Sequence, residues 1–176
     1  MNTRIWIADR ASRRYNGQWS IPAKGHAMFD LVKKLMAGPE AEPLSADEEL
    51  RLAAAALLFR AVFVDGHADD DEIAMVRRIL EDEFGLDADA TAALMAEAQS
   101  AAQSAGDLYG WTKRVNAHYS IDEKCYLMEK LWQVVLADDH VDDMESAMMR
   151  RLAGLIYVTD ADSARARQAA QESKDT

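Results

Sequence analysis

Residues 63–80 read FVDGHADDDEIAMVRRIL, and the chain repeats this pattern 73 positions later. Residues 65–79 align with residues 138–152 through nine identities in fifteen positions, and the apolar run before each copy also corresponds. Each copy predicts a helix, an acidic turn and a second helix. A repeated unit commonly buries its apolar face against a neighbouring copy. We therefore expect the two copies to pack as a pair, with both turns at one end of a bundle.

The rest of the chain is also helical in pattern, because apolar residues recur at a spacing of three and four and no segment alternates like a strand. Residues 50–64 are apolar almost all round, which predicts a central helix. The fold class expected is all-α: a compact bundle of seven to eight helices with two pseudo-symmetric helix–acidic turn–helix repeats. The predicted helices cover about residues 29–36, 46–64, 70–84, 87–104, 108–118, 122–137, 142–157 and 161 onward. Gly85 is predicted to end the third of them as a left-handed cap, and Ser120 with Glu123 to start the sixth as a capping box.

The first 27 residues differ from the remainder. They carry a net charge of +4 within a chain of net charge −11, and they show no helical period. Three hypotheses stay open: an ordered arm that docks Trp6 and Trp19, an extension ahead of a natural start at Met28, or a nucleic-acid-binding arm. The domain organisation predicted is a basic arm or extension over residues 1–27 and one helical domain over residues 28–176.

Composition excludes several classes of protein. The acidic domain is a poor partner for nucleic acid, because its charge repels phosphate. Cys125 is the only cysteine, so no disulfide forms within the chain and a reducing compartment is favoured. No apolar run approaches the ~20 residues that span a bilayer. We expect a cytoplasmic protein without an integral membrane segment.

The acidic turns have a simple structural explanation in part. Asp69 with Glu72, and Asp142 with Glu145, fit the capping box that starts a helix. Capping does not need Asp65 or Asp138, which lie at the carboxyl end of the preceding helix, where the helix dipole disfavours an anion.

The other interpretation is a site for a hard divalent cation such as Ca²⁺, Mg²⁺ or Mn²⁺, which binds oxygen ligands. The turns are not EF-hands, because the glycine and glutamate of that loop are missing. His67 and His140 are auxiliary candidates, since imidazole beside carboxylates suits transition metals. The predicted metal ligands are Asp65, Asp69, Glu72, Asp138, Asp142 and Glu145.

The chain resembles the TerB-like family, named for bacterial tellurite-resistance proteins, over roughly residues 28–170. The residues that carry the resemblance are Val64-Asp65-Gly66 with Glu72, Leu136-Ala137-Asp138 with Asp142 and Glu145, and the stretch 155–160, LIYVTD. The resemblance implies an all-helical bundle of two pseudo-symmetric helix pairs, a link to tellurite and other stress responses, and metal sensing by acidic residues. Asp139 departs from the pattern, because the first copy has Gly66 at that position.

The chain carries no phosphate loop, GxSxG, HExxH or CxxC motif, so the sequence favours a function without catalysis. The favoured hypothesis is a non-enzymatic TerB-like module that binds a divalent metal, protein partners or both. The alternative is a helical scaffold or adapter whose acidic turns serve only as helix caps. A metal-dependent hydrolase is the third hypothesis.

Overall fold

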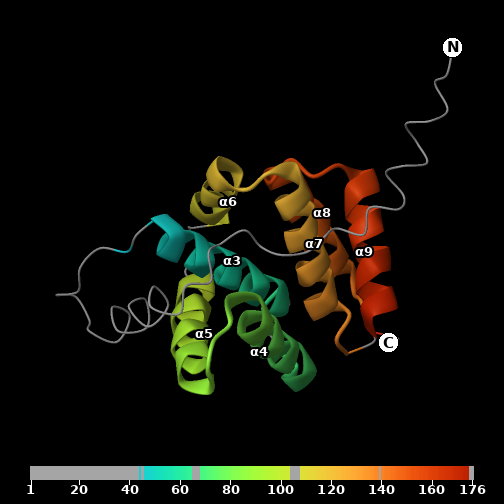
Figure 1. Cartoon of the computed structure of the whole chain (residues 1–176). Helices are drawn as coiled ribbons and strands as arrows, with labels where there is room; N and C mark the ends of the chain where they lie inside the picture. The colour runs from blue at the N-terminus through green and yellow to red at the C-terminus, as the bar shows by residue number, and fades with distance from the viewer. Residues whose placement is uncertain (1–43, 45, 65–67, 104–107, 139, 175–176) are drawn as a thin grey trace, which may run out of the picture.

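The computed structural model describes residues 44, 46–64, 68–103, 108–138 and 140–174. This part of the chain forms seven helices and no strand (Figure 1), which confirms the all-α prediction. The helix predicted at residues 29–36 and the basic arm lie outside the described residues. The helices are α3 (Ala46–Val62), α4 (Asp70–Phe84), α5 (Ala88–Gln103), α6 (Leu108–His118), α7 (Ile121–Val135), α8 (Asp143–Leu155) and α9 (Asp160–Lys174).

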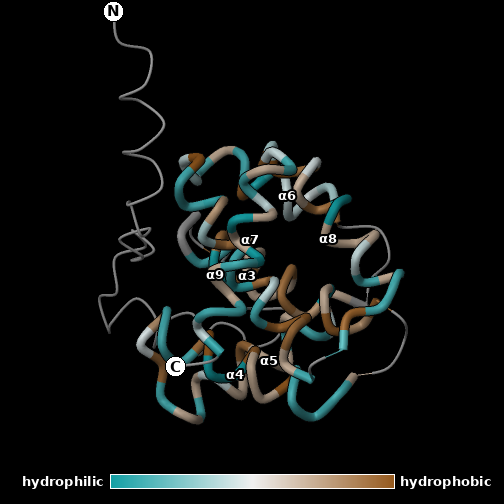
Figure 2. Tube along the Cα trace, turned by 90° about the vertical axis from the view of Figure 1, so that its right-hand side faces the viewer, coloured by the Kyte–Doolittle hydropathy of each residue, from teal (hydrophilic) through white to brown (hydrophobic). Residues whose placement is uncertain are grey.

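The hub of the bundle is α3, as its apolar sequence predicts. Every residue from 53 to 59 is buried, and α3 contacts α4, α5, α6, α7 and α8. Four consecutive alanines, residues 53–56, keep this helix narrow enough for neighbours to approach on several sides. In Figure 2 the outer turns are mostly hydrophilic, while hydrophobic stretches lie toward the inside of the bundle.

Three helices begin with the capping boxes that the sequence predicts. Ser120 caps α7, Asp69 caps α4 and Asp142 caps α8, and in each case the glutamate at the third helical position bonds back to the cap amide. Gly85 ends α4 in the left-handed conformation, with φ of 61°. These signals are local, so they fix where helices start and stop before any packing occurs.

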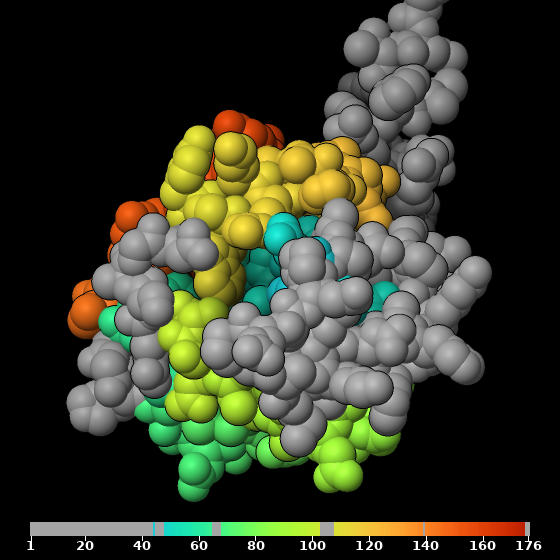
Figure 3. Space-filling view, turned by 90° about the vertical axis from the view of Figure 1, so that its left-hand side faces the viewer, coloured from blue at the N-terminus to red at the C-terminus, as the bar shows by residue number. Residues whose placement is uncertain are grey.

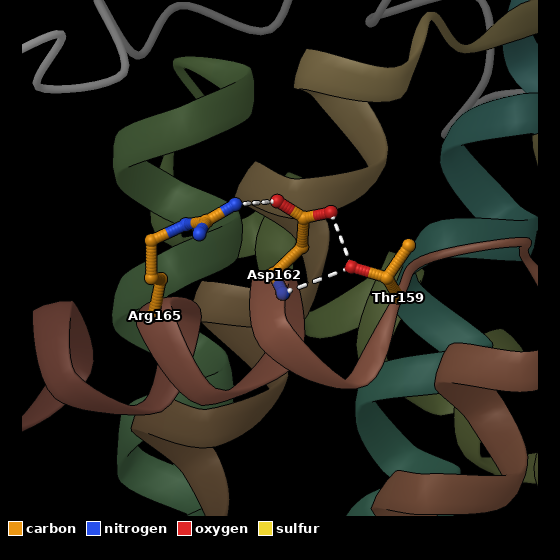
Figure 4. A network of polar contacts seen from close by, with 3 residues as sticks. All are labelled: Thr159, Asp162 and Arg165. Carbon is orange, nitrogen blue, oxygen red and sulfur yellow. Dashed lines mark hydrogen bonds and ion pairs between the residues drawn. The ribbon is translucent and has the colours of Figure 1, made fainter. Parts of the chain in front are cut away.

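The last helix begins with a cap that the sequence analysis did not identify. The hydroxyl of Thr159 donates to Asp162 Oδ2 at 2.6 Å and accepts from the Asp162 amide at 3.1 Å, while Arg165 pairs with the other oxygen of Asp162 (Figure 4). This Thr-x-x-Asp arrangement is a capping box in which the shorter aspartate replaces the usual glutamate at the third helical position. It explains why α9 starts at Asp160.

The same helix packs closely along α7. Its buried residues are Ser163, Ala166 and Ala170, whose small side chains let the two helices approach. The indole N–H of Trp132 donates to Ser163 Oγ at 3.4 Å, and Lys174 Nζ donates to the carbonyls of residues 136 and 137 at 2.6 and 3.0 Å. These two carbonyls follow the end of α7 at Val135, where the sequence predicted two more helical residues. Lys174 thus satisfies acceptors that the helix itself leaves free.

The two glycines at the ends of α4 and α8 give a stability test. Neither has an atom within 4 Å of an added Cβ, but Gly85 is left-handed and Gly154 is helical. We expect Gly85→Ala to lower the free energy of unfolding by about 1 kcal/mol, because alanine is strained at positive φ. Its matched control, Gly154→Ala, should raise it by about 0.5 kcal/mol, since alanine is the better helix former. Urea titrations measure both changes, and equal effects would contradict the backbone assignment.

Candidate functional site

The candidate site consists of the two acidic turns, one between α3 and α4 and the other between α7 and α8. In the first turn the Asp69 amide donates to Glu72 Oε2 at 3.2 Å, and Asp69 Oδ1 accepts from the Asp71 amide at 2.8 Å. In the second turn the reciprocal bonds between Asp142 and Glu145 are both 2.7 Å long. Four of the predicted metal ligands therefore take part in helix capping. Each of these bonds uses one of the two oxygens of the carboxylate concerned.

Asp138 and His140 shape the second turn. Asp138 Oδ1 accepts from the backbone amide of His140 at 2.9 Å, and both side chains are exposed. This bond is the aspartate turn that reverses the chain after a helix. The corresponding first-turn residues, Asp65 and His67, lie outside the described residues, so their predicted role as ligands stays a prediction.

Glu72 is more deeply buried than the other described acids of the turns. Its residue is only 5% exposed, whereas Glu145, at the same place in the second copy, is half-buried. Its Oε1 has no hydrogen-bond partner among the described residues. A buried polar atom without a partner costs folding free energy. A carboxylate at this place therefore needs a proton, a ligand or a cation.

The electrostatics place the two turns together. Burial raises the pKa of Glu72 to about 7, against the lowering effect of the Asp69 amide, and the charges of Glu145, Asp138 and Asp69 raise it further. Glu145 and Asp138 belong to the second turn, so the acids that act on Glu72 come from both turns, at one end of the bundle. In Figure 1 this end lies where α4 begins and α7 ends. The pseudo-symmetric relation between the copies stays a prediction.

The described residues do not by themselves complete a metal site. Within the described ranges, no group of three or more histidine, cysteine, aspartate or glutamate side chains is arranged to hold an ion. Oxygen atoms of Asp69, Asp138 and Asp142 point to backbone amides instead. The structure brings Glu72 within electrostatic range of three acids without joining them into a coordination shell.

A comparison with protein families identifies the family to which the chain belongs. The family model described as "Tellurite resistance protein TerB" matches residues 51–168, about two thirds of the chain. The chain belongs to the TerB family. The matched stretch runs from α3 into α9 and includes both acidic turns. Neither a curated protein nor a solved structure matches the chain. No helix in the described part of this TerB-family chain is long and apolar enough to cross a membrane.

A second polar cluster of the TerB domain joins α4 to α7, and sequence reasoning missed it. Glu83 Oε1 on α4 accepts from the Tyr126 hydroxyl at 2.5 Å and pairs with Lys130 Nζ at 2.9 Å, both on α7. The side chains of Glu83 and Lys130 are only 11% and 14% exposed. The four-residue spacing of Tyr126 and Lys130 on one helix face was the available signal, but nothing local identifies Glu83 as their partner.

The environment of Glu72 can be tested by measuring the free energy of unfolding as a function of pH, with a chelator present to remove divalent cations. Its folded pKa, about 7, lies above the ordinary 4.5, so its proton stabilises the folded state below pH 4.5 and this contribution is lost as pH rises through 7. Above pH 7, Glu72→Gln should therefore be more stable than wild type by up to roughly 3 kcal/mol, and the difference should vanish at low pH.

Glu123→Gln is the matched control for this experiment, because Glu123 has the same position in the capping box of α7. It should show no gain in stability above pH 7. Equal pH profiles for wild type and Glu72→Gln, measured by urea denaturation, would contradict the buried, acid-surrounded environment of Glu72.

The α4–α7 cluster predicts unequal effects of removing two cations. Lys130→Met leaves Glu83 buried without its cation and should lower the free energy of unfolding by about 3 kcal/mol. Arg165→Met removes a mostly exposed arginine from its pair with Asp162, and should cost at most about 0.5 kcal/mol. Denaturant titration of the two variants measures both losses of stability. Similar losses would contradict the prediction that the buried Glu83–Lys130 pair contributes more to stability than the exposed Asp162–Arg165 pair.

Proposed function

We propose that the paired acidic turns bind a divalent cation, with Glu72 as the innermost ligand. The observation that supports this most is the buried Oε1 of Glu72, which has no partner in the described part of the chain and lies near two acids of the opposite turn. A cation would replace the proton that Glu72 otherwise holds below its pKa of about 7. It would also offset the repulsion between the two turns.

Capping and cation binding are compatible in this arrangement. Each capping carboxylate gives one oxygen to a backbone amide: Glu72 and Glu145 use Oε2, while Asp69 and Asp142 use Oδ1. The second oxygen of the Glu72 carboxylate, which has no partner among the described residues, would be the atom offered to a cation. The capping bonds would then hold the carboxylates in fixed orientations, in the way that outer hydrogen bonds orient metal ligands elsewhere.

The donor set defines the class of cation. Glu72, Asp69, Asp138, Asp142 and Glu145 would contribute from the described residues, which do not complete a site by themselves. Asp65 is the further oxygen ligand predicted from the sequence. Such a set suits Ca²⁺, Mg²⁺ or Mn²⁺. His140 is exposed and bonded through its backbone to Asp138, so it can join as an imidazole ligand for Mn²⁺ or Zn²⁺, as His67 can from the first turn.

The biological role that follows is a non-enzymatic module in tellurite or other stress responses, acting in the cytoplasm and through protein partners. The family affiliation supports this assignment. Because α4 and α7 contact each other and carry one turn each, an ion between the turns would tie the two copies together. Occupancy would then change the rigidity of a surface that a partner can recognise.

Thermal denaturation with added cations tests the proposal. A ligand that binds only the folded state adds RT ln(1 + [L]/Kd), about 2.7 kcal/mol at a hundredfold excess over Kd. We expect Ca²⁺, Mg²⁺ or Mn²⁺ to raise the melting temperature of the wild type at pH 8. Glu72→Gln, and the double change Asp65→Asn with Asp138→Asn, should abolish this rise, whereas Glu123→Gln should keep it.

The alternative function makes a different prediction in the same experiment. The capping bonds at both turns favour a scaffold or adapter in which the acids only start helices. In that case Asp69→Ala and Asp142→Ala lower stability by about 1 kcal/mol each, and cations have no effect beyond screening. A flat melting temperature across Ca²⁺, Mg²⁺, Mn²⁺ and Zn²⁺ would overturn the metal proposal in favour of this one.

A further inference from the structure

A small apolar groove lies between α3, α5 and α6, formed by residues that play no part in the acidic turns. Its volume is about 180 Å³, and its apolar lining consists of Leu44, Leu52, Ala53, Ala101 and Trp111. At its edge Arg114 Nε pairs with Glu49 at 3.2 Å, and both side chains are substantially exposed. Figure 3 shows the face on which the helices that line this groove, α3, α5 and α6, come together.

Trp111 gives the groove a chemical requirement. The residue is only 7% exposed, and its indole Nε1 has no hydrogen-bond partner among the described residues. The other described tryptophan, Trp132, donates its indole N–H to Ser163. A buried indole N–H usually finds an acceptor. The apolar lining of the groove therefore suits an apolar side chain, and the Trp111 indole beside it calls for an oxygen acceptor.

The size of the groove favours a side chain over a small molecule. Sites for drug-sized ligands are roughly 300–1,000 Å³ in volume. A cavity of about 150 Å³ lined by apolar residues accepts a single benzene ring. The 180 Å³ groove thus fits one aromatic ring, or a pair of aliphatic side chains, presented by a segment of polypeptide.

The chain itself has such a segment at the right place. Leu44, the first described residue, lines the groove, so the preceding chain leaves from its edge. Residues 29–36 are predicted to be an amphipathic helix with Phe29, Val32, Leu35 and Met36 on one face. The seven residues 37–43 that connect them to Leu44 reach at most roughly 25 Å. This short tether keeps the segment at high effective concentration near the groove.

We infer that residues 28–37 dock over the α3–α5–α6 groove through the face that carries Phe29, Val32, Leu35 and Met36, with the Phe29 ring as the side chain that fills the groove. Gly38 and Pro39 end the predicted helix, so its last carbonyls have no partner within the helix. One of these carbonyls supplies the acceptor that the Trp111 indole lacks. The functional domain then begins at about residue 28, ahead of the matched family region that starts at residue 51.

Cysteine pairs in the full chain test the contact directly. Val32→Cys with Leu52→Cys places one thiol on the predicted docking face and one in the groove. Lys34→Cys with Leu52→Cys is the matched control, because residue 34 lies on the opposite side of the helix, about 160° away from residue 32 at 100° per residue. The native Cys125 is buried and does not interfere.

Under mild oxidation the Val32→Cys pair should form a disulfide within one chain much faster than the control pair. Equal rates for the two pairs, or no disulfide in either, would overturn the proposal. A disulfide-linked dimer from the Val32→Cys pair would overturn it as well, because a second copy would then occupy the groove.

A second measurement follows Trp111 without introducing new thiols. Its indole resonance, identified by loss of the signal in Trp111→Phe, should shift in Phe29→Ser and stay in place in Lys34→Ser. Phe29→Ser should also lower the melting temperature of the full chain by about 5 °C or more, as loss of a buried ring does in a domain of this size. An unchanged indole signal and melting temperature in Phe29→Ser would count against docking.

Discussion

The bundle depends on the burial of α3 from all sides. A helix that is apolar nearly all round cannot lie at a surface, so it must be covered by other helices. Five helices contact it, and its buried alanines let them come close. The two repeat units therefore share one hydrophobic core, in which α3 of the first unit also packs against α7 of the second. The acidic turns reach the same end of the molecule as a consequence of this packing.

The packing makes two chemically equal turns unequal. Glu72 and Glu145 have the same capping role and the same neighbours in sequence, yet only Glu72 is fully buried. Both α4 and α8 lie against α3 and α7, but only α4 is also tied to α7 by the buried Glu83–Lys130–Tyr126 cluster. Capping keeps one oxygen of Glu72 bonded and leaves the other without a partner among the described residues, within electrostatic range of Glu145 and Asp138. In the proposed function, this asymmetry makes Glu72 the innermost ligand.

The groove on the other side of α3 follows from the same constraint. Leu52 and Ala53 extend the apolar surface of the hub to the space between α5 and α6, where the indole N–H of the buried Trp111 has no partner among the described residues. Because α3 is apolar on nearly every side, its surface in this groove is a physical reason for a further helix to pack there. The position of the acidic turns and the presence of the groove thus have one cause. The central helix α3 packs against helices from outside its own repeat unit.

The sequence alone determined the helices, their caps and the repeat, because these features depend on contacts within about four residues or on a periodic apolar pattern. Ser120, Asp69 and Asp142 start their helices as predicted, and Gly85 ends α4 as predicted. Only the tertiary structure decided how residues of the same type differ in burial, in pairing and in backbone conformation. It buried Glu72 and left Glu145 partly exposed, it paired Glu83 with Lys130, and it set Tyr157 in a left-handed conformation at φ of 61° where a glycine would be expected. Burial and partner choice depend on residues far apart in the chain, so no local pattern contains them.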